Sequence, residues 1–244
     1  MHSSSERRDP PAAGASAGLA LLLLVPVPSL STAAASFWWP GTTLGQSVFI
    51  AGKLWLAVFP LAWWLKVERG RWSGSPPRRG GFGVAVILGL LIAGAIFGGY
   101  AVATHLGWID PATVAGRAAQ TGLNHPSIYV AGAVYWVTLN SLMEEYVWRW
   151  FVFRQCEGLA GGPAAVVLSA LAFTLHHIVA LAGQFSWTIT LLGSAGVFTG
   201  GAIWSLLYLR YRSIWPCYVS HAIVDLPIFI IGWRLIFGSQ GVAS

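Results

Sequence analysis

Long apolar segments separated by short polar ones make up most of the chain. A helix needs about 20 mostly apolar residues to cross the hydrocarbon core of a bilayer. The segments that approach this length lie at residues 17–37, 44–65, 81–107, 127–153, 163–182, 185–209 and 216–237. The pattern therefore predicts an all-α fold, a polytopic transmembrane helix bundle with about seven spans.

The composition supports a membrane protein rather than a soluble one. Charged residues make up 9% of the chain and hydrophobic residues 56%, whereas soluble domains carry about 25% charged residues. The net charge of +6 comes mainly from basic residues in short loops between the apolar segments. This placement does not indicate nucleic-acid binding. We expect the lipid bilayer, and no nucleic acid, to be the partner of the chain.

The polar segment at residues 66–80, KVERGRWSGSPPRRG, predicts the orientation in the membrane. Its charged residues are five cations and one anion: Lys66, Arg69, Arg71, Arg78, Arg79 and Glu68. The positive-inside rule assigns such a loop to the cytoplasm. Counting spans from it places the N-terminus and the loop residues Arg154, Arg210 and Arg212 on the same side. We therefore expect a multi-pass protein of a bacterial-type plasma membrane, with a cytoplasmic N-terminus.

The segments outside the spans complete the predicted organisation. Asp110-Pro111 is typical of a helix start, because Asp caps the first turn and Pro fits its first position. The expected units are a disordered tail at 1–16, three spans at 17–107, an outer interfacial segment at 108–126, a second helix bundle at 127–237 and a short tail at 238–244.

The first apolar segment has a second interpretation. Arg7 and Arg8 precede an apolar run, and small residues follow at Ala33–Ala35, which is the arrangement of a cleaved signal peptide. We favour an ordinary first span, because further spans follow it.

Two cysteines, Cys156 and Cys217, occur in the chain, without a CxxC or Cys-His spacing. A disulfide framework and a structural zinc site are therefore not indicated, and we expect no cofactor.

Ionisable residues inside the apolar segments are the strongest functional signal. An acid or a cation at the centre of a membrane helix costs about 2.5–3.5 kcal/mol, so such residues indicate a functional site by default. The residues concerned are Glu144, Glu145, Arg149, His176, His177, His221 and Asp225.

Helical spacing sorts these residues into pairs. Glu145 and Arg149 are four residues apart, which places them on one face where they can form an ion pair. His221 and Asp225 have the same spacing in another span, and His177 follows Phe173 by four in a third. Glu144 is turned by about 100° from its neighbour and needs a different environment.

Purely structural explanations compete with function at each position. Glu145 and Arg149 can serve as an ion pair that holds two helices together, and His177 can be a hydrogen-bonded interhelical histidine. We interpret His176 as a packing or supporting residue and expect Lys53 to snorkel or to pair locally, without a role in the site. The presence of a polar group with a neighbour one turn away in each of three spans favours function.

The chemistry available to these groups is hydrolysis by activated water. Glu144, His177 and His221 lie at depths of about 13, 21 and 8 Å from the cytoplasmic ends of their spans. A buried carboxylate and an imidazole can hold and deprotonate water, and a second imidazole can donate to an oxyanion. The sequence contains no GxSxG or HExxH motif and no plausible cysteine nucleophile.

Three short motifs in this order carry a resemblance to a known family. They are EExxxR from Glu144, FxxxH from Phe173 and HxxxD from His221. Together, within about residues 127 to 230, they resemble the CAAX-protease and bacteriocin-processing (CPBP, or ABI) family of glutamic intramembrane proteases. The resemblance implies that the bundle at 127–237 is a catalytic unit that needs no metal.

The resemblance also implies roles for individual residues. Glu144 would activate water with the help of His177, and Arg149 would pair with Glu145. His221 would donate to the oxyanion, and Asp225 would hold the second position of that motif. The best-understood branch of the family has asparagine there and eight spans. An ionised aspartate cannot donate, so Asp225 would be protonated or would orient His221 as an acceptor.

The leading interpretation is an intramembrane endopeptidase that acts on a membrane-associated peptide or protein. A prenylated C-terminal tail, a bacteriocin leader and a membrane-anchored sorting tail all remain open as substrates. The alternatives are a non-catalytic immunity or scaffold protein and a proton-coupled transporter, although no inverted repeat supports transport. A metal-dependent variant would use His177, His221 and Asp225 as ligands and would be sensitive to chelators.

Overall fold

The computed structural model describes residues 14–77 and 80–238, and these parts of the chain are helical with short connections and no strand. The predicted all-α fold is therefore confirmed. The elements are α1 (Gly14–Leu24), α2 (Pro26–Ala33), η1 (Ala34–Trp38), α3 (Thr43–Lys66), α4 (Phe82–His105), α5 (Pro111–Gln120), α6 (Pro126–Tyr135), η2 (Trp136–Asn140), α7 (Ser141–Glu145), η3 (Tyr146–Phe153), α8 (Arg154–Ala160), α9 (Gly162–Ala182), α10 (Trp187–Tyr211) and α11 (Ile214–Phe237).

Among residues 14–77 and 80–238, six helical segments are long and apolar enough to cross a membrane. The remaining predicted span, 127–153, lies within a helical stretch that continues from α6 to α8 and that contains Glu144, Glu145 and Arg149. The six are Gly14–Trp38, Thr43–Lys66, Phe82–His105, Gly162–Ala182, Trp187–Tyr211 and Ile214–Phe237. The chain is thus an integral, polytopic membrane protein, and its spans begin and end within a few residues of the predicted positions.

Local sequence explains where helix α5 begins. Asp110 caps α5, since its carboxylate accepts hydrogen bonds from the backbone amides of Ala112 and Thr113 and from the Thr113 hydroxyl. These bonds, that of the Thr113 side chain foremost, lower the pKa of Asp110. The helix start predicted at Asp110-Pro111 is therefore present. Of the predicted tails, residues 1–13 and 239–244 lie outside the described residues, and Gly14 already belongs to α1.

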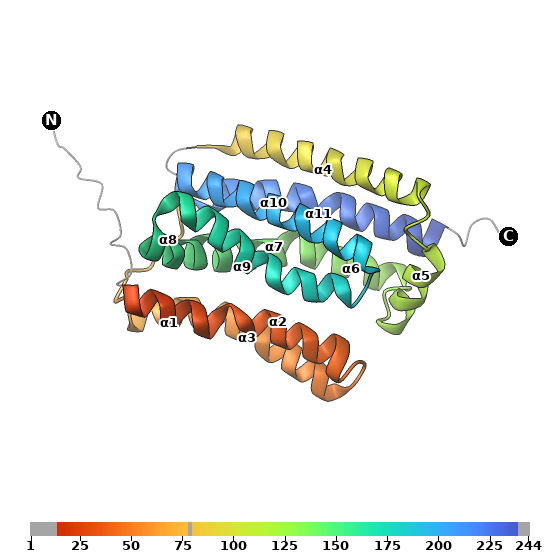
Figure 1. Ribbon diagram of the computed structural model, residues 1–244, viewed down its shortest axis with the longest axis horizontal. Helices are drawn as coiled ribbons and strands as arrows, with labels where there is room; N and C mark the ends of the chain where they lie inside the picture. Colours follow the sequence, from red (N-terminus) through yellow and green to blue (C-terminus); the bar gives the residue numbers. More distant parts are fainter. Residues whose placement is uncertain (1–13, 78–79, 239–244) are drawn as a thin grey trace.

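The helices form layers along a common axis (Figure 1). Helix α4 lies on one side and packs against α11, whereas α1 to α3 lie on the opposite side. Between them run the stretch from α6 to α8 and the pair α9 and α10. Because this stretch is covered on most sides, Trp148, Phe151 and Phe153 of η3 are buried almost completely, whereas Tyr146 and Trp150 are partly buried.

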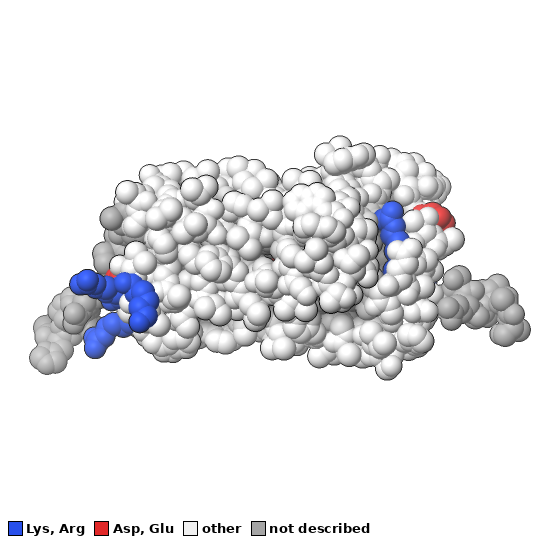
Figure 2. Space-filling view, turned by 90° about the horizontal axis from the view of Figure 1, so that it is seen from below, with Lys and Arg blue, Asp and Glu red and all other residues white. Residues whose placement is uncertain are grey.

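The outer surface suits a lipid environment. Large apolar side chains such as Leu22, Leu91 and Leu191 are about two-thirds exposed, at 69%, 65% and 66%. On the face seen in Figure 2, charged side chains gather at the two ends of the long axis, and the surface between them carries none. An apolar belt between charged ends is the arrangement that a bilayer requires.

The loop after α3 is held to the helix bundle by hydrogen bonds to the start of α8 and to the start of α11. Glu68 accepts hydrogen bonds from Arg154 and from the Gln155 amide. The Ser213 hydroxyl donates to the Ser75 carbonyl, and the Ser75 hydroxyl accepts from the Ile214 amide. Arg78 and Arg79, which contribute to the predicted orientation, lie outside the described residues.

Candidate active site

Helix α7 carries both glutamates into the interior of the bundle. Glu144 is 8% exposed and Glu145 is fully buried. The helix is flanked by two wider π-helical turns, η2 and η3. Such turns interrupt the regular α-helical spacing and are frequent at functional sites. They are local features that apolar periodicity did not predict.

Glu145 is the centre of a buried ion cluster. Its Oε1 atom lies 3.3 Å from Nη1 of Arg149, so the predicted ion pair is present. Arg149 is itself 1% exposed, and its guanidinium lies over the rings of Phe173 and Trp204 at 4.7 and 5.1 Å. Its Nη2 donates to the Gly201 carbonyl at 3.3 Å. The pair therefore joins the stretch from α6 to α8 to helices α9 and α10.

His221 of α11 reaches both glutamates. Its Nδ1 lies 2.7 Å from Glu145 Oε1, which is a hydrogen bond, and its Nε2 lies 3.7 Å from Glu144 Oε2. The ring stacks on Trp204 with a centroid distance of 3.9 Å and an interplanar angle of 17°. Because one nitrogen is held by Glu145 and one face by Trp204, the Nε2 edge is fixed toward Glu144.

Asp225 lies one turn further along α11, as predicted, but its hydrogen bond goes elsewhere. Its Oδ2 accepts from the Ser141 hydroxyl at 2.6 Å, while its Oδ1 is 3.8 Å from His221 Nε2. The second distance exceeds a hydrogen bond. Glu145, rather than Asp225, is therefore the direct hydrogen-bond partner that orients His221.

His177 and His176 of α9 approach Glu144 from a third direction. The Phe173 carbonyl accepts a hydrogen bond from Nδ1 of His177 at 3.0 Å, which leaves Nε2 as an acceptor in the neutral ring. The His176 ring lies 4.0 Å from that of His177 and stacks on Trp148 at 5.2 Å. His176, interpreted from the sequence as a packing or supporting residue, therefore lies directly beside the candidate catalytic groups.

Potential metal ligands gather here in a set that differs from the predicted alternative. Among residues 14–77 and 80–238, one potential ligand atom each from Glu144, His176 and His177 falls within 4.8 Å of the other two. Imidazole nitrogens and carboxylate oxygens are common ligands of catalytic zinc, so the chemistry of this set fits a zinc ion. The ligand set His177, His221 and Asp225 is not supported.

The contacts of Lys53 differ from those expected from the sequence. Its ammonium donates a hydrogen bond to Asn140 Oδ1 at 2.8 Å, and Asn140 Nδ2 donates to Glu144 Oε1 at 2.9 Å. The expectation of snorkelling or local pairing was wrong, because the partner lies on another helix. Asn140 precedes Glu144 by four residues, and this spacing could have indicated the contact between them. The contact between Lys53 and Asn140 joins two helices and could not be predicted from spacing.

All six residues selected from the sequence thus lie in one cluster, built from the stretch around α7 and from α9 and α11. His177 and Asp225 are partly buried and the other four are buried. The cluster includes Glu144, Glu145, Arg149, His177, His221 and Asp225. The spread of predicted depths did not keep these groups apart.

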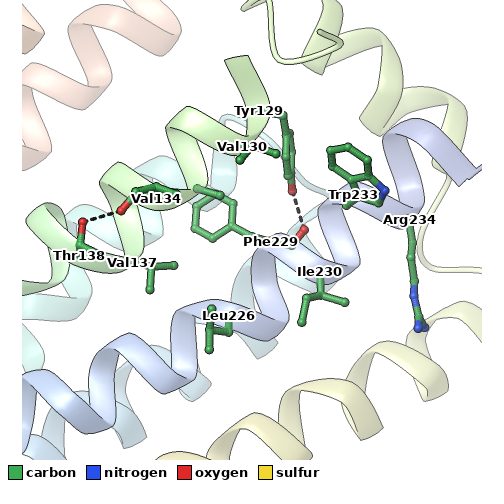
Figure 3. A pocket seen from close by; sticks show the side chains of 11 residues that line it. Tyr129, Val130, Val134, Val137, Thr138, Leu226, Phe229, Ile230, Trp233 and Arg234 are labelled. Atoms are coloured by element: carbon green, nitrogen blue, oxygen red, sulfur yellow. Dashed lines mark hydrogen bonds between the residues drawn. The ribbon is translucent and has the colours of Figure 1, made fainter. Parts of the chain in front are cut away.

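Two apolar grooves open on the part of the chain that the structure describes, and neighbours of Glu144 and Glu145 in the sequence line one of them. A groove of about 390 Å³ lies between α3, the stretch carrying Glu144, and the loop before α4. Leu139, Leu142, Met143 and Tyr146 contribute to its wall. The other, about 420 Å³, lies between α6 and α11, with Trp233 and Arg234 at one end (Figure 3). None of the six cluster residues lines either groove, but Leu142, Met143 and Tyr146 of the first groove flank Glu144 and Glu145 in the sequence. The first groove is therefore the candidate for binding a substrate.

A family model described as type II CAAX prenyl endopeptidase Rce1-like matches residues 126–227. This range includes all six residues of the cluster, and the match confirms the resemblance inferred from the three motifs. No curated protein and no solved structure matches the chain. The family match and the apolar spans together indicate a membrane endopeptidase.

Proposed function

We propose that this Rce1-like membrane endopeptidase hydrolyses a peptide bond of a membrane-associated substrate through water activated by Glu144 and His177. One observation carries the proposal: Glu144 lies beside His177 and faces His221, so that a carboxylate and two imidazoles from three helical segments share one buried site. Oε1 of Glu144 is occupied by Asn140, which leaves Oε2 to act as the base.

In the first step, a water molecule is held between Glu144 Oε2 and His177 Nε2. Glu144 takes a proton while the water oxygen bonds to the scissile carbonyl carbon, and the carbonyl electron pair moves onto its oxygen. His221 Nε2 donates to this oxyanion. Since Nδ1 of His221 is held by Glu145, Nε2 carries a proton when the ring is cationic. The carboxylates of Glu144, Glu145 and Asp225 around the ring favour that state.

In the second step, the oxyanion restores the carbonyl and the carbon–nitrogen bond breaks. Glu144 returns its proton to the leaving amine, so the carboxylate is regenerated and one water molecule is consumed. Neither step requires a covalent intermediate or a metal ion. Asp225 does not enter the chemistry directly: its hydrogen bond from Ser141 holds a negative charge near His221.

Cleavage by the purified protein in lipid vesicles tests this proposal. We expect a membrane-anchored peptide to yield two fragments by mass spectrometry, with the same rate before and after treatment with a strong chelator. The cluster of Glu144, His176 and His177 makes a metal-assisted route the second candidate mechanism. Three results together would show that zinc, rather than Glu144 alone, activates the water. They are loss of cleavage on chelation, its return when zinc is added, and bound zinc in the purified protein. Absence of any cleavage would favour the scaffold alternative, and proton-dependent uptake into the vesicles would favour transport.

The groove beside α7 is proposed to hold the apolar part of the substrate. Ala57 lines this groove and Tyr146 donates a hydrogen bond to its carbonyl, so a large side chain here fills space next to the site. We expect Ala57→Trp to raise KM about tenfold, or ~1.4 kcal/mol, with kcat unchanged, because it removes binding that ground and transition states share.

Val58→Trp is the matched control, because Val58 is 61% exposed and does not line the groove. Its steady-state kinetics should equal those of the unmodified protein. Equal KM values for both tryptophan variants would show that the substrate does not use this groove.

A further inference from the structure

Lys53 is a cation in the middle of a membrane span. It lies ten residues after the start of α3 at Thr43, or about 15 Å along the helix axis. A lysine at such a depth costs about 2.5–3.5 kcal/mol in insertion, and its aliphatic stem is too far from either end of α3 for easy snorkelling. A cation kept at this depth indicates a partner or a role.

Its partner is Asn140, and the hydrogen bonds around Asn140 have a fixed direction. An ammonium group can donate but cannot accept, so the amide oxygen of Asn140 must face Lys53. The amide nitrogen then faces Glu144 and donates to Oε1. Asn140 is 2% exposed, so water does not readily compete for either bond. Lys53 thereby determines which end of the amide meets the carboxylate.

The surroundings hold the ammonium in this position. Its Nζ lies 5.8 Å from the ring centroids of both Phe49 and Trp136, within the range of a cation–π contact. Phe49 belongs to α3 and Trp136 to η2, so the rings lie on both sides of the contact between the two helices. The arrangement restricts the ammonium to the neighbourhood of Asn140.

We propose that Lys53 is a positioning residue for Glu144, acting through Asn140 and through its own positive charge. The contact fixes Oε1, leaves Oε2 free toward His221 and favours the ionised carboxylate that a general base needs. Without the ammonium, the Asn140 amide is free to turn its oxygen toward the carboxylate, which would repel it. This inference rests on the proposed role of Glu144. It also makes α3, which lies outside the matched range 126–227, a part of the site.

The test compares Lys53→Met with Lys53→Arg in the full-length protein in vesicles. We expect the methionine variant to lower kcat about 10- to 100-fold, the range for losing a hydrogen bond to a charged group, with KM little changed. The acid limb of its pH–rate profile should move to higher pH, because the cation that favours ionised Glu144 is gone. The arginine variant should restore much of kcat and the position of the acid limb.

Two controls separate positioning from a purely structural role. Lys66→Met, at the end of the same helix, should leave activity and pH profile unchanged. In an Asn140→Leu background, Lys53→Met should have a much smaller additional effect, because the relay is already broken.

A Lys53→Met protein with an unchanged pH profile and kcat would overturn the inference. A fall in kcat that is fully explained by a smaller amount of folded protein would overturn it as well. If Glu144→Gln still abolishes cleavage in that case, the proposed function stands and only the role of Lys53 fails.

Discussion

Replacing Glu144 with glutamine is expected to lower kcat by a factor of about 10²–10⁴, the contribution of a positioned general base. The substitution keeps the size of the side chain and the acceptor for Asn140 but removes the proton acceptor. Since no base then deprotonates the attacking water, kcat and kcat/KM should fall together, whereas KM should change little. Single-turnover cleavage of a membrane-anchored peptide, followed by mass spectrometry, measures the effect.

Insertion and abundance provide the control for this variant. Within the part of the chain that the structure describes, Glu144 has no ion pair within hydrogen-bond distance, since His221 Nε2 lies 3.7 Å from its Oε2. We therefore expect Glu144→Gln to reach the membrane in normal amounts and to melt at nearly the unmodified temperature. A variant that stays folded and cleaves at the original rate would remove Glu144 from the mechanism.

The spans and the ion pair at α7 could be predicted from the sequence because both depend on local spacing. An apolar run of bilayer length predicts a span wherever it folds, and a separation of four residues places Glu145 and Arg149 on one face. The order of the three motifs further indicated that their helices converge. Convergence of α7, α9 and α11 around Glu144 agrees with that expectation.

Contacts that depend on rotamers and on helix rotation could not be predicted in this way. His221 and Asp225 do share a face, but the His221 ring turns its Nδ1 toward Glu145 and Asp225 bonds to Ser141. Spacing along one helix does not determine which neighbour from another helix offers the nearer atom. The same reason explains Lys53, whose partner Asn140 is 87 positions away in the chain.

Loss of the cation at Arg149 should produce the largest effect on stability. Arg149→Met leaves Glu145 fully buried with a single hydrogen-bond partner, His221, and with Oε2 unpaired. Breaking a buried ion pair by removing one partner costs about 3–5 kcal/mol. In a chain of this size each kcal/mol lowers Tm by roughly 2–4 °C, so we expect a fall of roughly 6–20 °C in detergent-solubilised protein.

Arg212→Met is the matched control, because its pair with Glu157 is partly exposed, with side-chain exposures of 43% and 23%. Exposed pairs contribute about 0–1 kcal/mol, so this variant should melt within a few degrees of the unmodified protein. The double variant Glu145→Gln/Arg149→Met removes both charges and should be less destabilised than Arg149→Met alone, because no uncompensated carboxylate remains. If the two substitutions instead add, Glu145 and Arg149 do not stabilise one another.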